Sequence, residues 1–169
     1  MKAVVNTRAT RSAVQQVTTN TTSWIGHQPL DHKNIIGGQT FMVPVAADLE
    51  AIEVFTSMVT TPGKVQLTLY SFDSQLQSWG SVLGSADADV TLSDNGKWKV
   101  FPITGLHLEK GNSYGFKLES NSFIGMGETA GCSQAPPLLN GKEWKFTNHE
   151  PNGDCYAYFS LAFKVDVRA

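Results

Sequence analysis

Apolar and polar residues alternate in short blocks along most of the chain, and Gly, Pro, Asp or Asn ends each block. In one block Val65, Leu67 and Leu69 share a face, and polar residues lie between them. A period of two residues is typical of a strand with one buried face. In the strand before it, Met58 is expected to point inward together with Ile52 and Val54. No segment has the helical period over a helical length. The pattern therefore predicts an all-β protein.

Turn signals divide this pattern into strands of ordinary length. Residues 61–63 and 109–111 are Gly-containing turns. The tight turn at residues 94–96 predicts a hairpin between the segments 89–92 and 98–103. The segment from 159 to 167 is expected to be the longest and clearest strand, because apolar residues occupy every second position.

About eight to ten strands of this length cannot bury their apolar faces in a single sheet. We therefore predict a two-sheet antiparallel β-sandwich, jelly-roll-like in its connections. An immunoglobulin-type sandwich is the alternative. It fits less well because the two cysteines, Cys132 and Cys155, lie near the C-terminus without the Cys, Trp, Cys spread of that fold.

The 169 residues suit one domain. Residues 1–22 are rich in Thr, Asn, Ser, Gln and Arg and contain no aromatic residue, which predicts a polar linker or an edge strand. Residues 23–169 are predicted to form the sandwich domain.

The weak net charge limits the choice of partners. The net charge is −2 and the isoelectric point is near 6.0. The sequence lacks the clustered Lys and Arg residues that are typical of proteins that bind nucleic acids or anionic lipids. No apolar stretch approaches the roughly 20 residues that a membrane span needs, and the N-terminus has no signal-peptide pattern. Neutral partners fit this composition better.

The sequence contains one match to a catalytic motif, and its context does not fit that motif. Residues 111–115 match the letters of the Gly-x-Ser-x-Gly nucleophile elbow, but a turn precedes Ser113 and a strand follows, whereas the elbow needs a strand and then a helix. The histidines are not spaced as a zinc pair. His107 is expected to be a solvent-facing strand residue. We therefore predict that the protein is not an enzyme.

Acidic residues leave two alternatives open. Glu128, Glu143, Glu150 and Asp154 lie in the C-terminal region and would suit a glycoside hydrolase if two of them were about 5–9.5 Å apart. Solvated loop charges are the simpler interpretation.

Asp87 and Asp89, with the turn residues Asp94 and Asn95, supply hard oxygen ligands that leave a structural Ca²⁺ ion open. No dense acidic loop accompanies them. No other cofactor or metal is predicted.

Cys132 and Cys155 enclose a loop-rich segment with several Pro and Gly residues. We expect a disulfide between them, which would stabilise the fold by roughly 3 kcal/mol and indicate an oxidising compartment. Two separate buried thiols are the alternative.

Aromatic residues in this region suggest a ligand platform. Trp79, Trp144 and Tyr156 are candidates for stacking on a sugar ring, because sugars have apolar faces rimmed by hydroxyls. The polar candidates beside them are Asn140, Asn148 and Asp154. Trp144 also has core packing as an equal alternative, since it would share one strand face with Phe146.

The order of core positions resembles jelly-roll accessory domains of secreted bacterial proteins, some of them similar to carbohydrate-binding modules. The residues that carry the resemblance are strand positions and one turn: 39–41, 49–54, 65–70, Trp98, Phe101, 108–114 and 161–165. The resemblance spans most of residues 39–167. It implies a non-catalytic domain and assigns no binding residue.

The sequence thus favours an extracellular or cell-surface module that binds a carbohydrate or another surface polymer. The alternative is a structural or adhesive domain that contacts a protein or a second copy of itself through a sheet edge or an aromatic patch.

Overall fold

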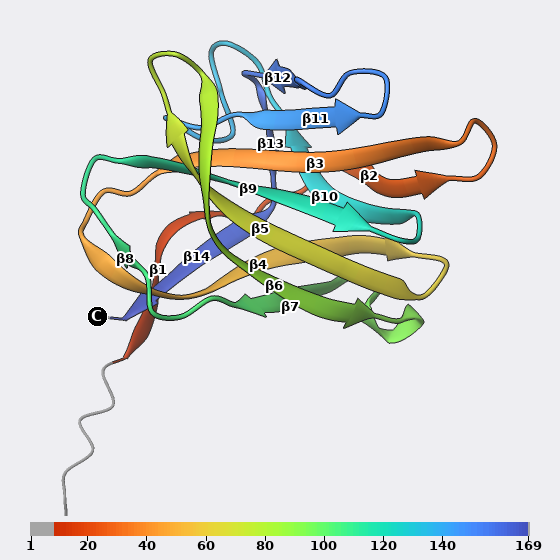
Figure 1. Cartoon of the computed structure of the whole chain (residues 1–169), viewed down its shortest axis with the longest axis horizontal. Coiled ribbons are helices and arrows are strands. Elements are labelled where there is room, and N and C mark those ends of the chain that lie inside the picture. The colour runs from red at the N-terminus through yellow and green to blue at the C-terminus, as the bar shows by residue number, and fades with distance from the viewer. Residues whose placement is uncertain (1–8, 169) are drawn as a thin grey trace, which may run out of the picture.

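The computed structural model describes residues 9–168, which fold into antiparallel strands and one short 3-10 helix (Figure 1). The elements in chain order are β1 Thr10–Gln16, β2 Thr21–Gln28, β3 Lys33–Met42, β4 Ala47–Val59, β5 Gly63–Asp73, β6 Ser78–Val90, η1 Leu92–Asp94, β7 Lys97–Pro102, β8 His107–Leu108, β9 Ser113–Ser120, β10 Ile124–Ala130, β11 Glu143–Thr147, β12 Asp154–Tyr156, β13 Phe159–Leu161 and β14 Phe163–Arg168. None of the described helices is long and apolar enough to span a membrane.

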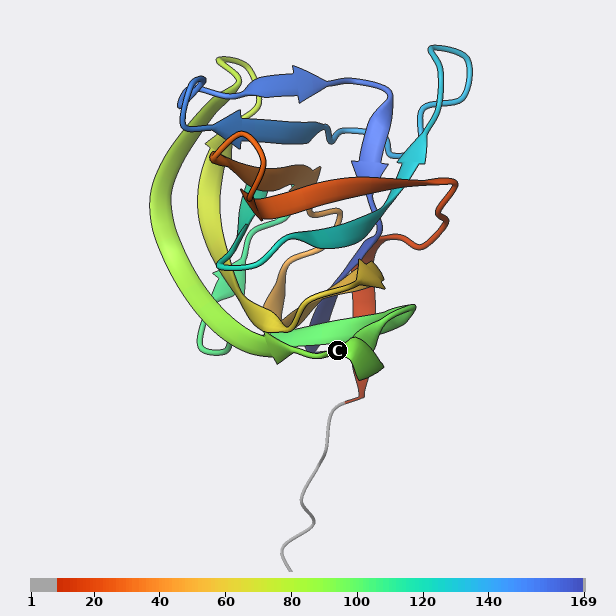
Figure 2. The same ribbon diagram turned by 90° about the vertical axis from the view of Figure 1, so that its right-hand side faces the viewer.

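The strands form two layers that face each other across the core (Figure 2). One layer has the order β1-β14-β4-β10, with β7 and β8 on β4 and β13 on β10. The other layer has the order β6-β5-β9-β3-β11-β12. This arrangement confirms the predicted antiparallel, jelly-roll-like β-sandwich.

Strand β2 belongs to both layers, so that one hydrogen-bonded path runs through the whole fold. Its first half pairs with β10, and its second half pairs with β3 from Gly26 onward. Gly26 has φ 98°, and a Cβ atom there would lie on the carbonyl oxygen of Ser122. Only glycine permits this bend, since the conformation and the close approach both exclude a side chain.

The core between the layers is made by the residues that the alternation placed inward, and Phe41, Phe101, Phe116 and Phe163 are its largest fully buried side chains. Met58 is a correction, because it is 44% exposed. The register between β4 and β10 shifts at Gly125 and Met126. This irregularity breaks the alternation at the end of β4 and turns Met58 outward.

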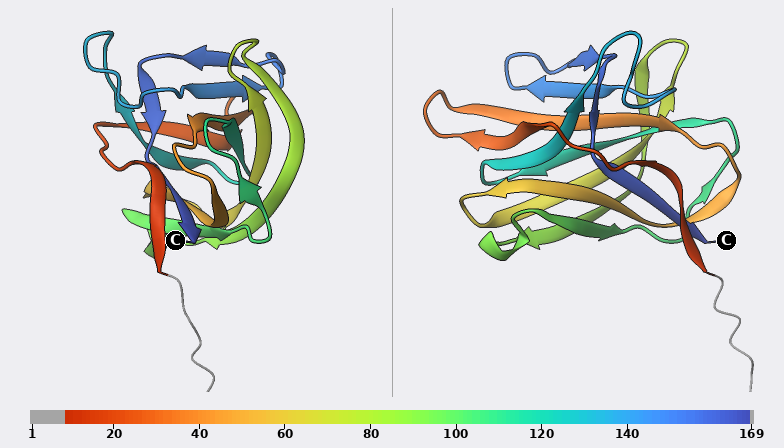
Figure 3. Two further views of the ribbon diagram at one scale, coloured as in Figure 1. Left: turned by 90° about the vertical axis from the view of Figure 1, so that its left-hand side faces the viewer. Right: turned by 180° about the vertical axis from the view of Figure 1, so that it is seen from behind.

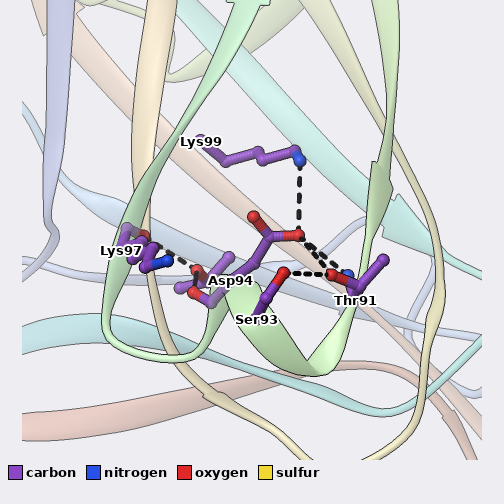
Figure 4. A network of polar contacts seen from close by, with 6 residues as sticks. Thr91, Ser93, Asp94, Lys97 and Lys99 are labelled. Carbon is purple, nitrogen blue, oxygen red and sulfur yellow. Dashed lines mark hydrogen bonds and ion pairs between the residues drawn. The ribbon is translucent and has the colours of Figure 1, made fainter.

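The predicted hairpin at residues 94–96 is wrong, because β6 lies in one layer and β7 pairs with β4 in the other. Helix η1 carries the chain across (Figure 4). The Asp94 carboxylate accepts a hydrogen bond from the Thr91 backbone N–H at 2.8 Å and contacts Lys99 Nζ at 3.3 Å. The turn at residues 94–96 therefore connects the two layers and does not close a hairpin, and these local contacts stabilise it.

Both ends of the described chain lie together, with β1 beside β14 (Figure 3). The segment predicted as a linker or edge strand therefore contributes an outer strand from Thr10 to Gln16, and its residues 1–8 lie outside the described residues. A domain boundary at residue 22 stays a prediction. The closing strand divides into β13 and β14, which pair with different strands.

Candidate functional site

The six predicted ligand residues do not form one platform, because the structure distributes them over four places, one of which is that of Asn148 beside the Asn34 backbone. Trp79 and Trp144 pack together on the outer face of β3, β9 and β11. Asn140 lines a pocket between two loops. Asp154 and Tyr156 line a different pocket.

The two tryptophans belong to what we call the aromatic cluster, formed by Phe72, Trp79, Trp144 and Phe146. The ring centroids of Trp79 and Trp144 are 5.8 Å apart in an edge-to-face arrangement, a favourable geometry for aromatic pairs. Trp144 is only 6% exposed, and Trp79 is half-buried. Trp144 therefore packs in a small second core, which is the alternative that the sequence left open.

Two glycines make room for this cluster. A Cβ atom on Gly115 would lie 2.5 Å from Trp79 Cζ3, and one on Gly38 would lie 3.1 Å from both Trp144 Cβ and Phe146 Cε2. Trp79 can therefore lie against the sheet backbone because these positions carry no side chain. Trp79 is part of β6.

Lys117 covers the cluster with its ammonium group. Its Nζ atom lies 4.9 Å from the ring centroids of Tyr70 and Trp79 and 4.2 Å from that of Phe146. Burial lowers the pKa of Lys117, while cation–π attraction favours its charged form. Lys117 thus occupies the ring faces that an exposed platform would offer to a ligand.

The strongest candidate site is a pocket of about 390 Å³, which we call the loop pocket. The β5–β6 connection and the loop between β10 and β11 form its walls. Its apolar lining includes Phe72 and Leu138, and its polar lining includes Gln77, Ser113 and Asn140. Phe72 also belongs to the aromatic cluster, so the pocket lies directly beside it.

Both walls of the loop pocket are held in unusual backbone conformations. Gln77 has φ 52° and Asn140 has φ 60°, and few residues other than glycine adopt this left-handed region. Such strain persists only where the surroundings impose it, and it concentrates at ligand sites.

Hydrogen bonds fix each wall. On the β5–β6 side, the Asp73 carboxylate accepts hydrogen bonds from the Gln75 and Leu76 backbone N–H groups at 2.9 Å, and Gln77 Nε2 donates to the Ser74 carbonyl. Gln77 Oε1 is buried without a partner among the described residues.

On the other side, the backbone of Thr40 donates to the Lys142 carbonyl at 2.9 Å, and the Lys142 N–H donates to the Thr40 hydroxyl at 3.0 Å. Asn140 lies two residues before this connection. The pocket is therefore organised before any ligand arrives, which reduces the entropy cost of binding.

A second pocket, the hairpin pocket, has a volume of about 320 Å³ and lies along β3, β11 and β12. Asp154 and Tyr156 line it together with Glu150. A hydrogen bond from Asp154 and the charge of that carboxyl raise the pKa of Glu150. Asn148 does not line it, and its Oδ1 accepts a hydrogen bond from the Asn34 N–H at 3.2 Å. These predicted residues thus serve a charged site on the other face of the β11–β12 hairpin from Trp144.

Glu128 and Glu143, the candidates for a hydrolase, do come together, but inside the protein. They are 3% and 0% exposed, and burial and the neighbouring Glu128 carboxyl raise the pKa of Glu143 to about 9. A catalytic pair must admit a sugar and often a water between its carboxyls. Two buried carboxyls in direct contact leave no such space.

The remaining candidate residues do not form a catalytic or metal site among the described residues. Cys132 and Cys155 are free, exposed cysteines, so the structure does not contain the expected disulfide. Ser113 begins β9 after a turn, as predicted, and His107 is exposed and bonded to Asp48 at 2.7 Å. Within residues 9–168 no group of three or more His, Cys, Asp or Glu residues could hold a metal ion, and Asp94 is engaged by Thr91 and Lys99.

Sequence reasoning missed Gln77, Phe72 and Leu138 as pocket residues. The alternation places Phe72 with Tyr70 on the face opposite Val65 and Leu67, which does not indicate a pocket. The strained conformation of Gln77 leaves no signal in the sequence, since glutamine rarely marks such a turn. Asn140, followed by glycine, was the one pocket residue with a visible turn signal.

The comparisons with known proteins concern fold only. No protein-family model matches the chain, and no curated protein matches it in sequence. Two solved structures of Cwp84, a surface-layer-associated protein of Clostridium difficile, are similar in fold. The first contains the cysteine protease and lectin-like domains, and it matches 81% of this chain with a TM-score of 0.53 and 10% identity. The second, the cysteine protease after propeptide cleavage, matches 95% of this chain with a TM-score of 0.59 and 10% identity. This chain covers 32% and 40% of those two chains, well under half of each.

Proposed function

We propose that the protein is a non-catalytic binding module that recognises a carbohydrate or another neutral surface polymer in the loop pocket, outside the cell or at its surface. The observation that carries this proposal is the pocket itself. Two walls in strained, hydrogen-bonded conformations present amide and hydroxyl groups beside the apolar surface of Phe72 and Leu138. Sugars need this combination of an apolar contact and directed hydrogen bonds.

Two further findings support a binding role. The fold likeness falls on the lectin-like domain of Cwp84 and not on its protease domain. Of the two close pairs among the hydrolase candidates, Glu128 and Glu143 are buried, and the carboxyls of Glu150 and Asp154 lie so close together that no sugar fits between them. Neither finding identifies a ligand, and the fold alone would not assign one.

The test is binding of the purified chain to a broad panel of polysaccharides and glycans. Asn140→Ala and Gln77→Ala should each weaken a selective hit by about fivefold, since a lost hydrogen bond to a neutral group costs about 1 kcal/mol. Asn148→Ala is the matched control, because its side chain lies outside the loop pocket. Binding should persist at about 1 M salt, since neutral contacts are not screened. A hit that Asn148→Ala weakens as much as Asn140→Ala would place the ligand elsewhere.

A protein-contacting role is the second candidate, favoured by two exposed leucines beside the same pocket. Leu76 is 77% exposed on the β5–β6 connection, and Leu139 is 76% exposed on the opposite wall. Exposed apolar residues that gather at one site often mark a protein interface. Sedimentation that depends on concentration, abolished by Leu76→Ser with Leu139→Ser, together with a blank glycan panel, would favour this role.

A further inference from the structure

Two glutamates inside the sandwich are the least expected feature of the fold. Glu143 has no exposed surface, and Glu128 is 3% exposed. Apart from the contacts of Glu143 with Glu128 and Ser23, both carboxyl oxygens of Glu143, Glu128 Oε2 and Ser23 Oγ have no hydrogen-bond partner among the described residues. Buried polar atoms without partners are rare in native proteins and call for a physical reason.

The pair connects elements of the two layers. Glu143 is the first residue of β11 and lies opposite Gln39 of β3 on one side and Tyr156 of β12 on the other. Glu128 lies in β10, opposite Leu161 of β13. The carboxyl contact therefore joins the β11–β12 hairpin to a strand of the opposite layer.

The surroundings cannot neutralise two negative charges. Lys145 of β11 is the one basic group that acts on Glu143, and Tyr156 of β12 is the other titratable neighbour besides Glu128. Ser23 of β2 and Gln39 of β3 are neutral. Gln39 already uses its Oε1 atom to accept a hydrogen bond from the Leu161 N–H at 2.9 Å. Two ionised carboxylates in contact repel strongly in a buried site, whereas one shared proton turns the contact into a short, strong hydrogen bond.

The same hairpin carries a second pair of this kind at its tip. The carboxyl groups of Glu150 and Asp154 are neighbours across the turn between β11 and β12, and the proximity of Asp154 raises the pKa of Glu150. Lys33 and Lys145 line the same pocket. No ion pair within 4 Å connects those lysines to either acid in the described structure. This second pair is exposed and lies within the hairpin, so the buried pair is the one that connects the hairpin to the opposite layer.

We propose that Glu128 and Glu143 form a proton-operated latch: one shared proton holds the β11–β12 hairpin closed against β10, and loss of that proton releases the hairpin. The described fold is the protonated, closed form. Opening moves Trp144 and Phe146 away from Trp79, since both lie on β11, and it exposes the aromatic cluster.

The sign of the pH dependence follows from the burial. A carboxyl group whose pKa is higher in the closed form than in the open form stabilises closure at low pH, and this stabilisation declines as the pH rises. For Glu143 the decline runs from its ordinary value of 4.5 to about 9. Within that window the opening equilibrium should rise by up to tenfold for each pH unit, the limit for release of one proton.

Hydrogen exchange of the full chain between about pH 5 and about pH 9, read by mass spectrometry and corrected for the intrinsic rate, tests the latch. Peptides from residues 143–156 should lose protection progressively as the pH rises, while peptides from β9 and β14 keep theirs. Tryptophan fluorescence should shift to longer wavelength in parallel, because Trp79 and Trp144 become exposed to water.

Glu143→Gln should flatten both profiles, because an amide keeps the shape and cannot ionise. Glu128→Gln should narrow the pH range of both changes without abolishing them, because burial, the largest cause of the raised Glu143 pKa, remains; this variant serves if the first does not fold. Glu119→Gln, an exposed acid on β9, is the matched control and should retain the wild-type profile.

Three results would overturn the proposal. One is a flat wild-type profile for residues 143–156, a result that needs no variant. Another is an unchanged pH dependence in Glu143→Gln or Glu128→Gln. The third is hairpin protection that increases with pH and disappears on addition of a chelator, since the two carboxylates would then be holding a cation and not a proton.

Discussion

Replacing Gly115 with alanine tests whether the aromatic cluster depends on the bare backbone beneath it. The new Cβ atom would lie 2.5 Å from Cζ3 and 2.7 Å from Cη2 of Trp79, and 3.2 Å from Thr40 Cγ2. Carbon atoms prefer separations of about 3.5–4.0 Å, so the indole ring has to move by roughly 1 Å or more. Trp144 and Phe146 block that movement, because both pack against Trp79.

The expected cost is the balance of two effects. Overpacking a well-filled cluster costs about 1–3 kcal/mol. Alanine offsets about 0.4–1 kcal/mol of this by restricting the unfolded chain, since Gly115 has no positive φ that alanine would resist. The net loss should be about 0–2.6 kcal/mol, which corresponds to a decrease in Tm of up to roughly 10 °C for a domain of this size.

Urea unfolding followed by near-ultraviolet circular dichroism measures both the stability and the tryptophan environment. Gly38→Ala is the graded control, because its Cβ atom would lie 3.1 Å from its nearest neighbours and requires only a small shift. Trp79→Phe should rescue Gly115→Ala in a double-mutant cycle, since the smaller ring leaves space for the methyl group. If Gly115→Ala is as stable as wild type and shows no coupling to position 79, Trp79 does not lie against this strand and the reasoning fails.

Three other predictions concern Asp94, Glu53 and the two cysteines. Asp94→Ala should lose about 1 kcal/mol of stability in urea unfolding at neutral pH. The Thr91 N–H keeps the pKa of Asp94 below its usual 3.8, so this difference should disappear in strong acid, and a difference that persists there would have another cause. A hydrogen bond with the Asp166 carboxyl raises the pKa of Glu53 to about 7. The stability that this pair contributes therefore declines as the pH rises from about 4.5 through 7. Glu53→Gln should reduce the fall in Tm over that interval, and an unchanged fall would contradict the pairing. Thiol titration of the native protein should find both Cys132 and Cys155 reactive, with a Tm that reductant does not change, whereas recovery of fewer than two thiols would support the disulfide.

The sequence predicts the fold class well because strand alternation is a local property. Val65, Leu67 and Leu69 face the core as their spacing requires, and Tyr70 and Phe72 lie on the opposite face. Pairing between distant strands is not local. The turn at residues 94–96 looks the same in sequence whether it closes a hairpin or carries the chain to the other layer, and only the contacts of β7 with β4 decide.

The candidate site was harder to predict for a related reason. An aromatic residue in a connection or on the outward face of a strand normally meets water, which made Trp79 and Trp144 reasonable candidates for a platform. The structure covers that face with a second layer of side chains, because Gly38 and Gly115 open a recess in the sheet surface. A glycine in a strand pattern indicates close approach of another group, but the sequence does not say which group approaches.

The buried polar residues gather where the β11–β12 hairpin docks on the sandwich. The inward face of β3 is apolar at Phe41 but carries Gln39, and β10 and β11 place Glu128 and Glu143 near the same level of the sandwich. A packed core gains nothing from acids that could be leucines, since an apolar replacement of a buried ionic group is often neutral or stabilising. Their presence where the hairpin docks therefore argues that closure of the hairpin is conditional. Because Trp144 lies on that hairpin and packs against Phe72, the latch and the loop pocket share one aromatic cluster, and a change in protonation at the first should alter the wall of the second.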